Sequence, residues 1–338
     1  MNNILIKSDN LLGLQWLLDQ GYEGKIDLVY IDPPFATGDI FSIDASGRTA
    51  TISKAADAVL AYKDHLKGAT YIDFLRQRIL LLHKLLSDKG SIYLHIDYKI
   101  GHYVKVLMDE IFGMRNFRND ITRIKCNPKN FSRIGYGNIK DMVLFYTKGN
   151  HPIWNEPKLP YSDQDLLKAY NKIDHAGRYY TTVPIHAPGE TKDGETCKPF
   201  RGIYPPAGRH WRCSVDELER LDKAGLIEWS KNGNPRKINY AAIMKGKKVQ
   251  DIWDFKDPTY PSYPTQKNLD MLNMIVKASS NTDSIVLDCF CGSGTTLQAA
   301  TLLNRKWIGI DESDIAIKIS KQNLNQYSLC CTYDYIEL

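Results

Sequence analysis

The fold of this chain is decided by residues 26–35, which read Ile26-Asp27-Leu28-Val29-Tyr30-Ile31-Asp32-Pro33-Pro34-Phe35. The apolar run predicts a buried parallel strand that ends at the carboxylate of Asp32. Two prolines then stop the strand, because proline cannot donate a ladder hydrogen bond. The turn would hold an acid, a free carbonyl and an aromatic ring at the carboxyl end of a sheet, where ligands bind in open α/β folds. A plain loop start, with Asp32 as a cap and Phe35 in the core, is the structural alternative.

A second motif near the other end of the chain reads Asp288-Cys289-Phe290-Cys291-Gly292-Ser293-Gly294-Thr295-Thr296. It predicts a strand, a tight glycine turn and a helix, and the next strand again ends in an acid, Asp311. That acid stands where ribose hydroxyls are commonly held. The pattern is neither GxGxxG nor GxxxxGK[ST], so dinucleotide and P-loop interpretations do not fit.

S-adenosylmethionine (AdoMet) suits this second motif better. Its carboxylate requires backbone N–H groups at a helix N-terminus, which Gly294-Thr295-Thr296 would supply. Its ammonium and sulfonium require carboxylate or carbonyl oxygens, which strand ends such as Asp288 would supply. A glycine turn that serves packing alone is the alternative.

The remaining pattern alternates strands with helices, which predicts most of a doubly wound α/β sheet. Asp9 follows the first strand and stands as the N-cap of the first helix. A contact with a ligand at that strand end is its second interpretation. Residues 36–68 show no clear period, and a loop of this length beside a strand end is usually functional or disordered.

Residues 151–250 are irregular, with many prolines, glycines, aromatic residues and basic residues, and a single predicted helix at 215–224. Basic side chains interleaved with aromatic ones suit phosphate contact and base stacking. The composition is equally compatible with an ordinary solvated domain. The candidate nucleic-acid contacts are Arg209, Trp211, Arg212, Lys231 and Arg236.

Composition sets wider limits. The chain has 338 residues with 44 Lys and Arg against 39 Asp and Glu, a mild formal charge of +5 that does not by itself indicate nucleic acid. Its seven cysteines form no CxxC pair, so we expect no metal site and a reduced, cytoplasmic protein. We expect no signal peptide and no membrane span. His83 and His95 are interpreted as hydrogen-bonded structural histidines.

With these motifs in view, the chain resembles the amino-group DNA methyltransferases, which modify adenine N6 or cytosine N4. The resemblance rests on Asp32-Pro33-Pro34-Phe35, on residues 290–296 and on Pro264-Thr265-Gln266-Lys267. The catalytic motif precedes the AdoMet motif, as in the permuted β class. Residues 208–211 and 229–233 also resemble pieces of type III modification subunits. Cys289 and Asn268 depart from prolines that are common in relatives, but neither change removes a functional group.

The resemblance implies a Rossmann-like, circularly permuted methyltransferase sheet with an inserted target-recognition region. The expected domains are a catalytic half at 1–149, the target-recognition region at 150–255 and an AdoMet-binding half at 256–338. The implied partners are double-stranded DNA, a homodimer and a cognate restriction subunit. The implied cofactor-binding residues are Asp9, Lys267, Asp288, Phe290, Gly292, Ser293, Gly294, Thr295, Thr296 and Asp311.

The implied reaction is methyl transfer from AdoMet to the N6 amine of a flipped adenine. Asp32 and the Pro33 carbonyl would accept the amine hydrogens, and Phe35 would stack on the flipped base. No Pro-Cys pair occurs, which excludes cytosine C5 chemistry. Asp rather than Ser before Pro33 favours adenine N6 over cytosine N4. An RNA or protein amide methyltransferase and a catalytically inactive DNA-binding subunit remain as alternatives.

Overall fold

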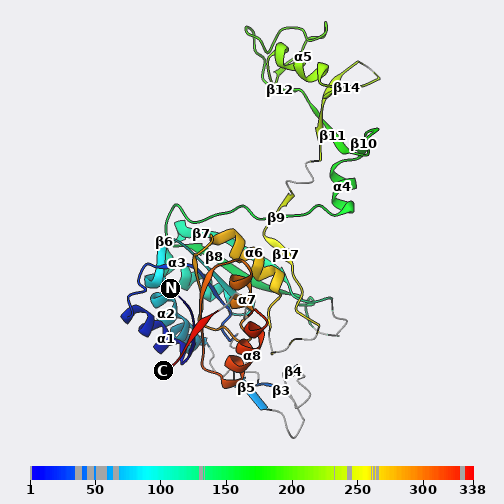
Figure 1. The fold of residues 1–338 in the computed structure, drawn as a ribbon. Helices are drawn as coiled ribbons and strands as arrows, with labels where there is room; N and C mark the ends of the chain where they lie inside the picture. Colours follow the sequence, from blue (N-terminus) through cyan, green and yellow to red (C-terminus); the bar gives the residue numbers. More distant parts are fainter. Residues whose placement is uncertain are drawn as a thin grey trace. The chain divides into compact units, whose positions relative to one another are not determined.

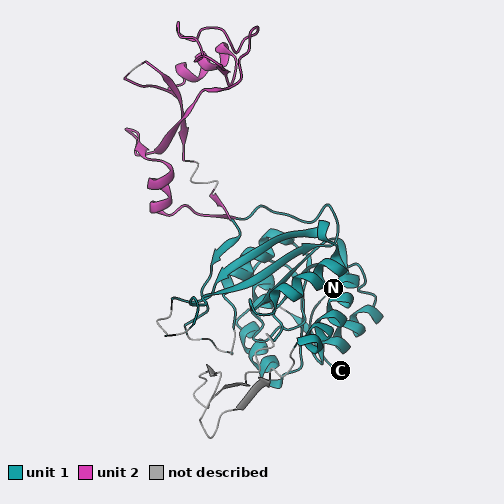
Figure 2. Cartoon of the chain, turned by 180° about the vertical axis from the view of Figure 1, so that it is seen from behind, with its two compact units in different colours: residues 1–157, 250–338 teal, residues 158–249 magenta. Residues whose placement is uncertain are grey.

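The computed structural model describes residues 2–34, 40–43, 49–50, 59–63, 68–128, 132, 134–231, 233–241, 246–259, 261, 263, 266–327 and 332–338. Phe35, most of 36–67, Asn232, Pro264 and Thr265 therefore lie outside the described residues. The chain forms two compact units (Figure 2). Unit 1 combines Met1–Pro157 with Gln250–Leu338, and unit 2 is Lys158–Val249.

Unit 1 is built on a sheet that has nine strands within the described residues, in the order β17-β7-β8-β6-β2-β18-β19-β1-β20. The six strands from β6 to β20 in this order run parallel, whereas β8 is antiparallel to both of its neighbours. The strands are β1 (Asn3–Lys7), β2 (Ile26–Ile31), β6 (Leu86–Ile96), β7 (Phe117–Ile124), β8 (Lys140–Thr147), β17 (Ile252–Asp254), β18 (Ile285–Asp288), β19 (Lys306–Asp311) and β20 (Tyr333–Glu337).

The two ends of the chain interleave in this sheet. Strand β18, from the second half of the chain, lies between β2 and β19, and β19 pairs with β1. Strand β2 continues through α2 (Gly68–Leu85) to β6 on one side, and β18 continues through α7 (Thr295–Leu302) to β19 on the other. The strand order thus reverses between β2 and β18, which is the position where open α/β sheets bind ligands. The predicted fold class, a permuted Rossmann-like sheet, is confirmed.

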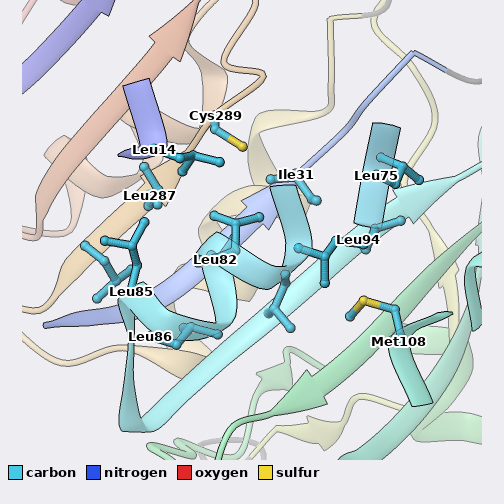
Figure 3. Packing of buried hydrophobic residues seen from close by; sticks show 14 of the residues in the cluster. Leu14, Ile31, Leu75, Leu82, Leu85, Leu86, Leu94, Met108, Leu287 and Cys289 are labelled. Atoms are coloured by element: carbon cyan, nitrogen blue, oxygen red, sulfur yellow. The ribbon is translucent and has the colours of Figure 1, made fainter. Parts of the chain in front are cut away.

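Helices cover both faces of the sheet, with α1, α2 and α3 on one face and α6, α7 and α8 on the other (Figure 1). The main core forms where α2 packs on the strands: Leu75, Leu82 and Leu85 meet Ile31 and Leu94 (Figure 3). The helices of unit 1 are α1 (Asn10–Asp19), α2 (Gly68–Leu85), α3 (Gly101–Phe112), α6 (Leu269–Ser279), α7 (Thr295–Leu302) and α8 (Asp314–Asn325), with a short 3-10 turn, η1 (Met114–Asn116).

Unit 2 has a core of its own, formed by Ile185, Phe200, Trp211, Leu218 and Ile227. The predicted helix at 215–224 is confirmed as α5, and the side chain of its N-cap residue accepts a backbone hydrogen bond. The elements are β9 (Lys158–Leu159), α4 (Asp163–Ala169), β10 (Lys172–Ile173), β11 (Tyr179–Pro184), β12 (His186–Pro188), β13 (Arg209–Trp211), α5 (Val215–Lys223), β14 (Ile227–Trp229), β15 (Pro235–Tyr240) and β16 (Lys247–Lys248).

Two stretches differ from expectation. The sequence Asp88-Lys89-Gly90 predicts a break between a helix and a strand at 91–97. In the structure these residues are part of β6, which begins directly after α2 and pairs with β2 through a register shift. The stretch 36–68, expected to be a loop, contains a three-stranded sheet of β3 (Ile40–Ile43), β4 (Thr49–Ala50) and β5 (Val59–Lys63). None of the helices in the described residues is both long and apolar enough to cross a membrane.

Candidate active site

The two motifs follow neighbouring strands. Val29 of β2 pairs with Leu287 of β18, so Asp32 and Asp288 leave the same edge of the sheet side by side. Leu287 pairs in turn with Ile308 of β19, which brings Asp311 to this edge as well. The Asp32 turn and the glycine turn therefore follow adjacent strands.

The glycine turn is held by the carboxylate that ends the next strand. The backbone N–H of Gly292 donates to Oδ2 of Asp311 over 2.8 Å, and Ser313 N–H donates to Oδ1 over 2.9 Å. Gly294 has a φ of 75° and a Cβ there would meet Ser320 Oγ at 2.8 Å, so glycine is required for conformation and for space. Burial raises the pKa of Asp311 to about 6.

Asp288 is built into the same turn. Its Oδ1 accepts the backbone N–H of Phe290 over 3.0 Å, and its Oδ2 accepts the hydroxyl of Thr296 over 2.6 Å. Burial raises the pKa of Asp288 to about 7, with smaller contributions from the charges of Asp32 and Asp311. Ser293 and Thr295, also predicted to bind cofactor, are buried in this turn with their hydroxyls 3.1 Å apart.

Asp32 is arranged differently. Its Oδ2 forms an ion pair with the ammonium of Lys267, which is 8% exposed. Its Oδ1 is buried and has no hydrogen-bond partner among the described residues. A buried polar atom without a partner is rare and requires an explanation. Pro33 and Pro34 follow directly, as the sequence requires.

Lys267 was predicted to bind the cofactor, and in the structure its ammonium contacts Asp32. An ammonium has three donors, so the contact with Asp32 leaves the predicted contact chemically compatible. The contact joins the segment before α6 to the Asp32 turn. No local sequence pattern could have indicated it, because the two residues are far apart in the chain.

Asp9 is confirmed as the N-cap of α1, since its Oδ1 accepts from the backbone N–H groups of Leu11 and Leu12. Its Oδ2 accepts from Arg78 over 3.2 Å, and the guanidinium of Arg78 lies 3.5 Å from the centre of the Phe74 ring. Burial lowers the pKa of Arg78. Asp9 stands beside the Asp311 strand end, because Ser8 N–H donates to the Asp311 carbonyl.

A polar network lies behind Asp32 inside the sheet. His95 of β6 is fully buried, with its Nδ1 2.9 Å from the hydroxyl of Tyr30 and 3.8 Å from Oδ1 of Asp32. Its Nε2 is 3.3 Å from Oδ2 of Asp141 on β8, and Oδ1 of Asp141 accepts from Lys125 over 2.6 Å. The sequence prediction of a hydrogen-bonded histidine is confirmed, but its proximity to Asp32 was missed. Polar residues within apolar strands were the available signal.

The predicted DNA contacts all lie in unit 2. Arg209 and Arg212 are exposed and hydrogen-bond to His186, through its Nδ1 and its carbonyl respectively. Arg236 is anchored on Thr182, and its charge also acts on His186. Burial lowers the pKa of His186, and these three arginines lower it further. Together they define one arginine cluster.

The other two predicted DNA contacts, Lys231 and Trp211, do not belong to this cluster. Lys231 is exposed in the turn between β14 and β15. Trp211 is 1% exposed in the core of unit 2, and its Nε1 donates to the Lys198 carbonyl. The prediction that Trp211 contacts DNA is therefore wrong, because a base cannot reach a ring buried in the protein core. Among the described residues, no group of His, Cys, Asp or Glu could hold a metal ion.

Comparisons with known proteins agree with this geometry. A family model described as DNA methylase (N6_N4_Mtase) matches residues 26–322. The chain is 43% identical to the type II methyltransferase M.EcaI of Enterobacter cloacae, over 94% of this chain and 68% of that protein. It is 28% identical to the StyLTI Mod subunit, a type III restriction-modification protein of Salmonella typhimurium, over 90% of this chain but 50% of that subunit.

Solved structures share the fold. The M1.HpyAVI–SAM complex superposes with a TM-score of 0.50, at 18% sequence identity, over 95% of this chain and 99% of that chain. The likeness at this identity concerns the fold alone. The match to the family model and the identity to M.EcaI carry the assignment: the chain belongs to the N6/N4 DNA methylase family, whose cofactor is S-adenosylmethionine.

Proposed function

We propose that this chain transfers a methyl group from AdoMet to the N6 amine of adenine in double-stranded DNA, as the methyltransferase of a cytoplasmic restriction–modification pair. The observation that carries the proposal is the buried Oδ1 of Asp32, an acceptor without a donor among the described residues. It lies where the sheet's strand order reverses, beside the glycine turn. An amine hydrogen of the target base is the donor that would complete it.

The glycine turn has the chemistry that the cofactor requires. AdoMet supplies the methyl group when bound. Asp311 uses each oxygen for one backbone N–H, and each oxygen keeps a second lone pair for a ribose hydroxyl. The start of α7 at Thr295 and Thr296 offers backbone N–H groups for a carboxylate. Asp288 contributes a negative charge for the ammonium.

The roles in transfer follow from the fixed groups around Asp32. The lone pair of the exocyclic amine is delocalised into the base, so the amine is a weak nucleophile. Oδ1 of Asp32 and the carbonyl of Pro33 would each accept one amine hydrogen and turn the lone pair outward. Lys267 holds Oδ2 and so fixes the orientation of the carboxylate. Phe35, outside the described residues, is the proposed stacking partner of the flipped base.

Unit 2 is the proposed target-recognition region, with DNA contacts at the arginine cluster of Arg209, Arg212 and Arg236 and at Lys231. Exposed guanidinium groups bind phosphates and base edges. The relatives' names include type III Mod subunits, which supports a cognate restriction subunit as a partner. A homodimer is a second proposed partner. Asp rather than Ser before Pro33 supports adenine over cytosine.

The decisive experiment measures methyl transfer from labelled AdoMet to unmethylated genomic DNA by wild type and Asp32→Ala. We expect the variant to lose transfer by at least about 10³-fold and to keep AdoMet binding. Asp27→Ala is the matched control, because Asp27 lies on the same strand and bonds only to Ser87 in the described part. Wild-type transfer by Asp32→Ala would refute the assignment.

Two further measurements separate the alternatives. Mass analysis of nucleosides from treated DNA distinguishes N6-methyladenine, which we expect, from N4-methylcytosine. Competition between duplex DNA and RNA tests the RNA alternative, and we expect only DNA to compete. AdoMet binding without transfer to any DNA would instead favour an inactive DNA-binding subunit.

A further inference from the structure

His95 occupies the space between two carboxylates in the interior of unit 1. Its Nδ1 faces Oδ1 of Asp32 at 3.8 Å and Tyr30 Oη at 2.9 Å, and its Nε2 faces Oδ2 of Asp141 at 3.3 Å. The ring is completely buried. The only carboxylate oxygen in this group without a hydrogen-bond partner among the described residues is the one on Asp32 that faces the ring.

The neighbours determine which nitrogen carries the proton. Burial would raise the pKa of Asp141, but the hydrogen bond from His95 and the charges of His95 and Lys125 hold it well below its usual range. Asp141 is therefore ionised and can only accept, so Nε2 of His95 must be the donor. Burial raises the pKa of Tyr30 well above its usual value, so its hydroxyl keeps its proton and donates to Nδ1.

We propose that His95 is the proton acceptor behind Asp32, taking up at Nδ1 the proton that methyl transfer releases from the amine of the base. The inference rests on the proposed function, since it assigns a role within that reaction. His95 does not touch the base and acts through Asp32. The neutral ring, with Nε2–H directed at Asp141, is the form that can accept.

The amine lone pair forms the new N–C bond, while the S–C bond of AdoMet breaks and its electron pair stays on sulfur. The amine nitrogen loses one proton to Oδ1 of Asp32. The Tyr30 hydroxyl turns away from Nδ1, and the proton passes from Oδ1 to Nδ1. The product is an imidazolium between two ionised carboxylates, those of Asp32 and Asp141, which stabilise it.

The charges around His95 explain why the ring is neutral before transfer. Burial lowers the pKa of His95, and Lys267 lowers it further, whereas Asp141 and Asp32 raise it. The net effect is a lowered pKa of His95, so the ring is unprotonated at neutral pH and can accept a proton there. The titratable and charged groups that act on His95 are Tyr30, Asp32, Asp141 and Lys267. Behind them, Arg123 of β7 and Lys125 pair with Asp141.

The first test is a pH profile of single-turnover methyl transfer to unmethylated genomic DNA, with AdoMet saturating at every pH so that Asp288 and Asp311 do not enter. In wild type the rate falls on the acid side as His95 becomes protonated, with a midpoint below the usual value for histidine. His95→Gln keeps an amide donor for Asp141 but cannot accept a proton. We expect it to lose about 10²-fold in rate and to lose this acid limb.

His83→Gln is the matched control. His83 is a half-buried histidine on α2, packed edge-on against Phe112, and burial lowers its pKa too. We expect its variant to keep both the wild-type rate and the wild-type profile. An acid limb with an unchanged midpoint in His95→Gln would overturn the inference.

A second variant gives a readout besides activity and does not depend on the folding of His95→Gln. Tyr30→Phe removes only the hydroxyl that donates to Nδ1 and favours the neutral ring. We expect the midpoint of the acid limb to move to higher pH. In ¹⁵N-histidine NMR of the cofactor-free protein, we expect His95 to carry its proton on Nε2 and to titrate at higher pH in Tyr30→Phe than in wild type.

The outcomes separate the two proposals. If wild type transfers no methyl group to DNA, or if Asp32→Ala retains transfer, the proposed function fails. If wild type is active, Asp32→Ala is inactive and NMR finds the His95 proton on Nδ1, only the role of His95 fails. Equal profiles for wild type and Tyr30→Phe would have the same meaning.

Discussion

Asp32 and Asp288 end neighbouring parallel strands, and yet their carboxylates are used in opposite ways. Both oxygens of Asp288 accept hydrogen bonds from its own turn, from Phe290 N–H and the Thr296 hydroxyl. Asp32 receives none from its turn in the described residues. One of its oxygens pairs with Lys267, and the other is buried without a donor.

The two environments distinguish a structural carboxylate, Asp288, from one that is positioned for a substrate, Asp32. Leaving a buried acceptor unpaired costs about 1–3 kcal/mol, so such a site persists where a ligand completes it. Asp288 has no such deficit, and its hydrogen bonds fix the path of the turn. The same strand-end position therefore serves two purposes, and the surrounding donors decide which.

The largest expected effect is the loss of methyl transfer in Lys267→Met, which tests the contrast between Asp32 and Asp288. The substitution leaves the carboxylate of Asp32 buried without a counter-charge and removes the contact that orients it. We expect methyl transfer to fall by about 10²–10³-fold. Single-turnover transfer of labelled methyl groups measures it, with folding followed by circular dichroism.

Lys277→Met is the control for Lys267→Met, because Lys277 lies on α6 with its side chain exposed. It should retain the wild-type rate. If Lys267→Met were as active as this control, the ion pair would not orient Asp32, and the contrast with Asp288 would lose its basis.

The strands behind this comparison could be predicted from sequence, because each is a short apolar run ending at an acid. The runs before Asp32, Asp288 and Asp311 carry that signal within a few residues. The ion pair between Asp32 and Lys267 could not be predicted, since it depends on how distant segments meet. The network of His95 and Asp141 was missed for the same reason.

Unit 2 was predicted less well, and Trp211 shows why. Its neighbours Arg209 and Arg212 gave the segment the composition of a nucleic-acid contact. In an extended strand, however, successive side chains point to opposite sides. Trp211, the last residue of β13, points into the small core, while Arg212, which follows the strand, is exposed. Short elements such as α4, which buries only Leu166, leave little periodicity to detect.

A second prediction concerns how the free energy of unfolding depends on pH through Asp288. The folded-state pKa of Asp288 is raised to about 7, so its contribution to stability is present at low pH and is lost as pH rises through about 7. We expect the cofactor-free protein to lose about 2 kcal/mol of unfolding free energy from this group between about pH 5 and about pH 7. Urea unfolding at each pH measures it.

Asp288→Asn should remove that part of the pH dependence, since an amide does not titrate. Asp254→Asn, at an exposed position of β17, should leave the wild-type slope unchanged. A wild-type slope in Asp288→Asn would mean that the pKa of this carboxyl is not raised in the folded protein.

The third prediction concerns the cofactor. Asp288→Asn keeps the oxygen that Phe290 N–H requires and loses the negative charge. We expect the dissociation constant for AdoMet to rise by about 10-fold, the magnitude of one charge-assisted hydrogen bond. Calorimetry without DNA measures it. Asp32→Ala should bind AdoMet as wild type does, and equal weakening in both variants would remove the distinction between the two carboxylates.

The smallest expected effect is on DNA affinity, and it tests whether charge reversal in unit 2 leaves the cofactor site of unit 1 unchanged. Arg209→Glu combined with Arg212→Glu reverses charge in the arginine cluster, and we expect DNA affinity to fall by several-fold to about 10-fold with a shallower salt dependence. AdoMet affinity should not change, because the cofactor residues lie in unit 1. Arg220→Glu is the control, since Arg220 is an exposed residue of α5 that pairs with Glu217. Loss of AdoMet binding together with DNA binding would mean that the substitutions unfold the protein rather than remove a DNA contact.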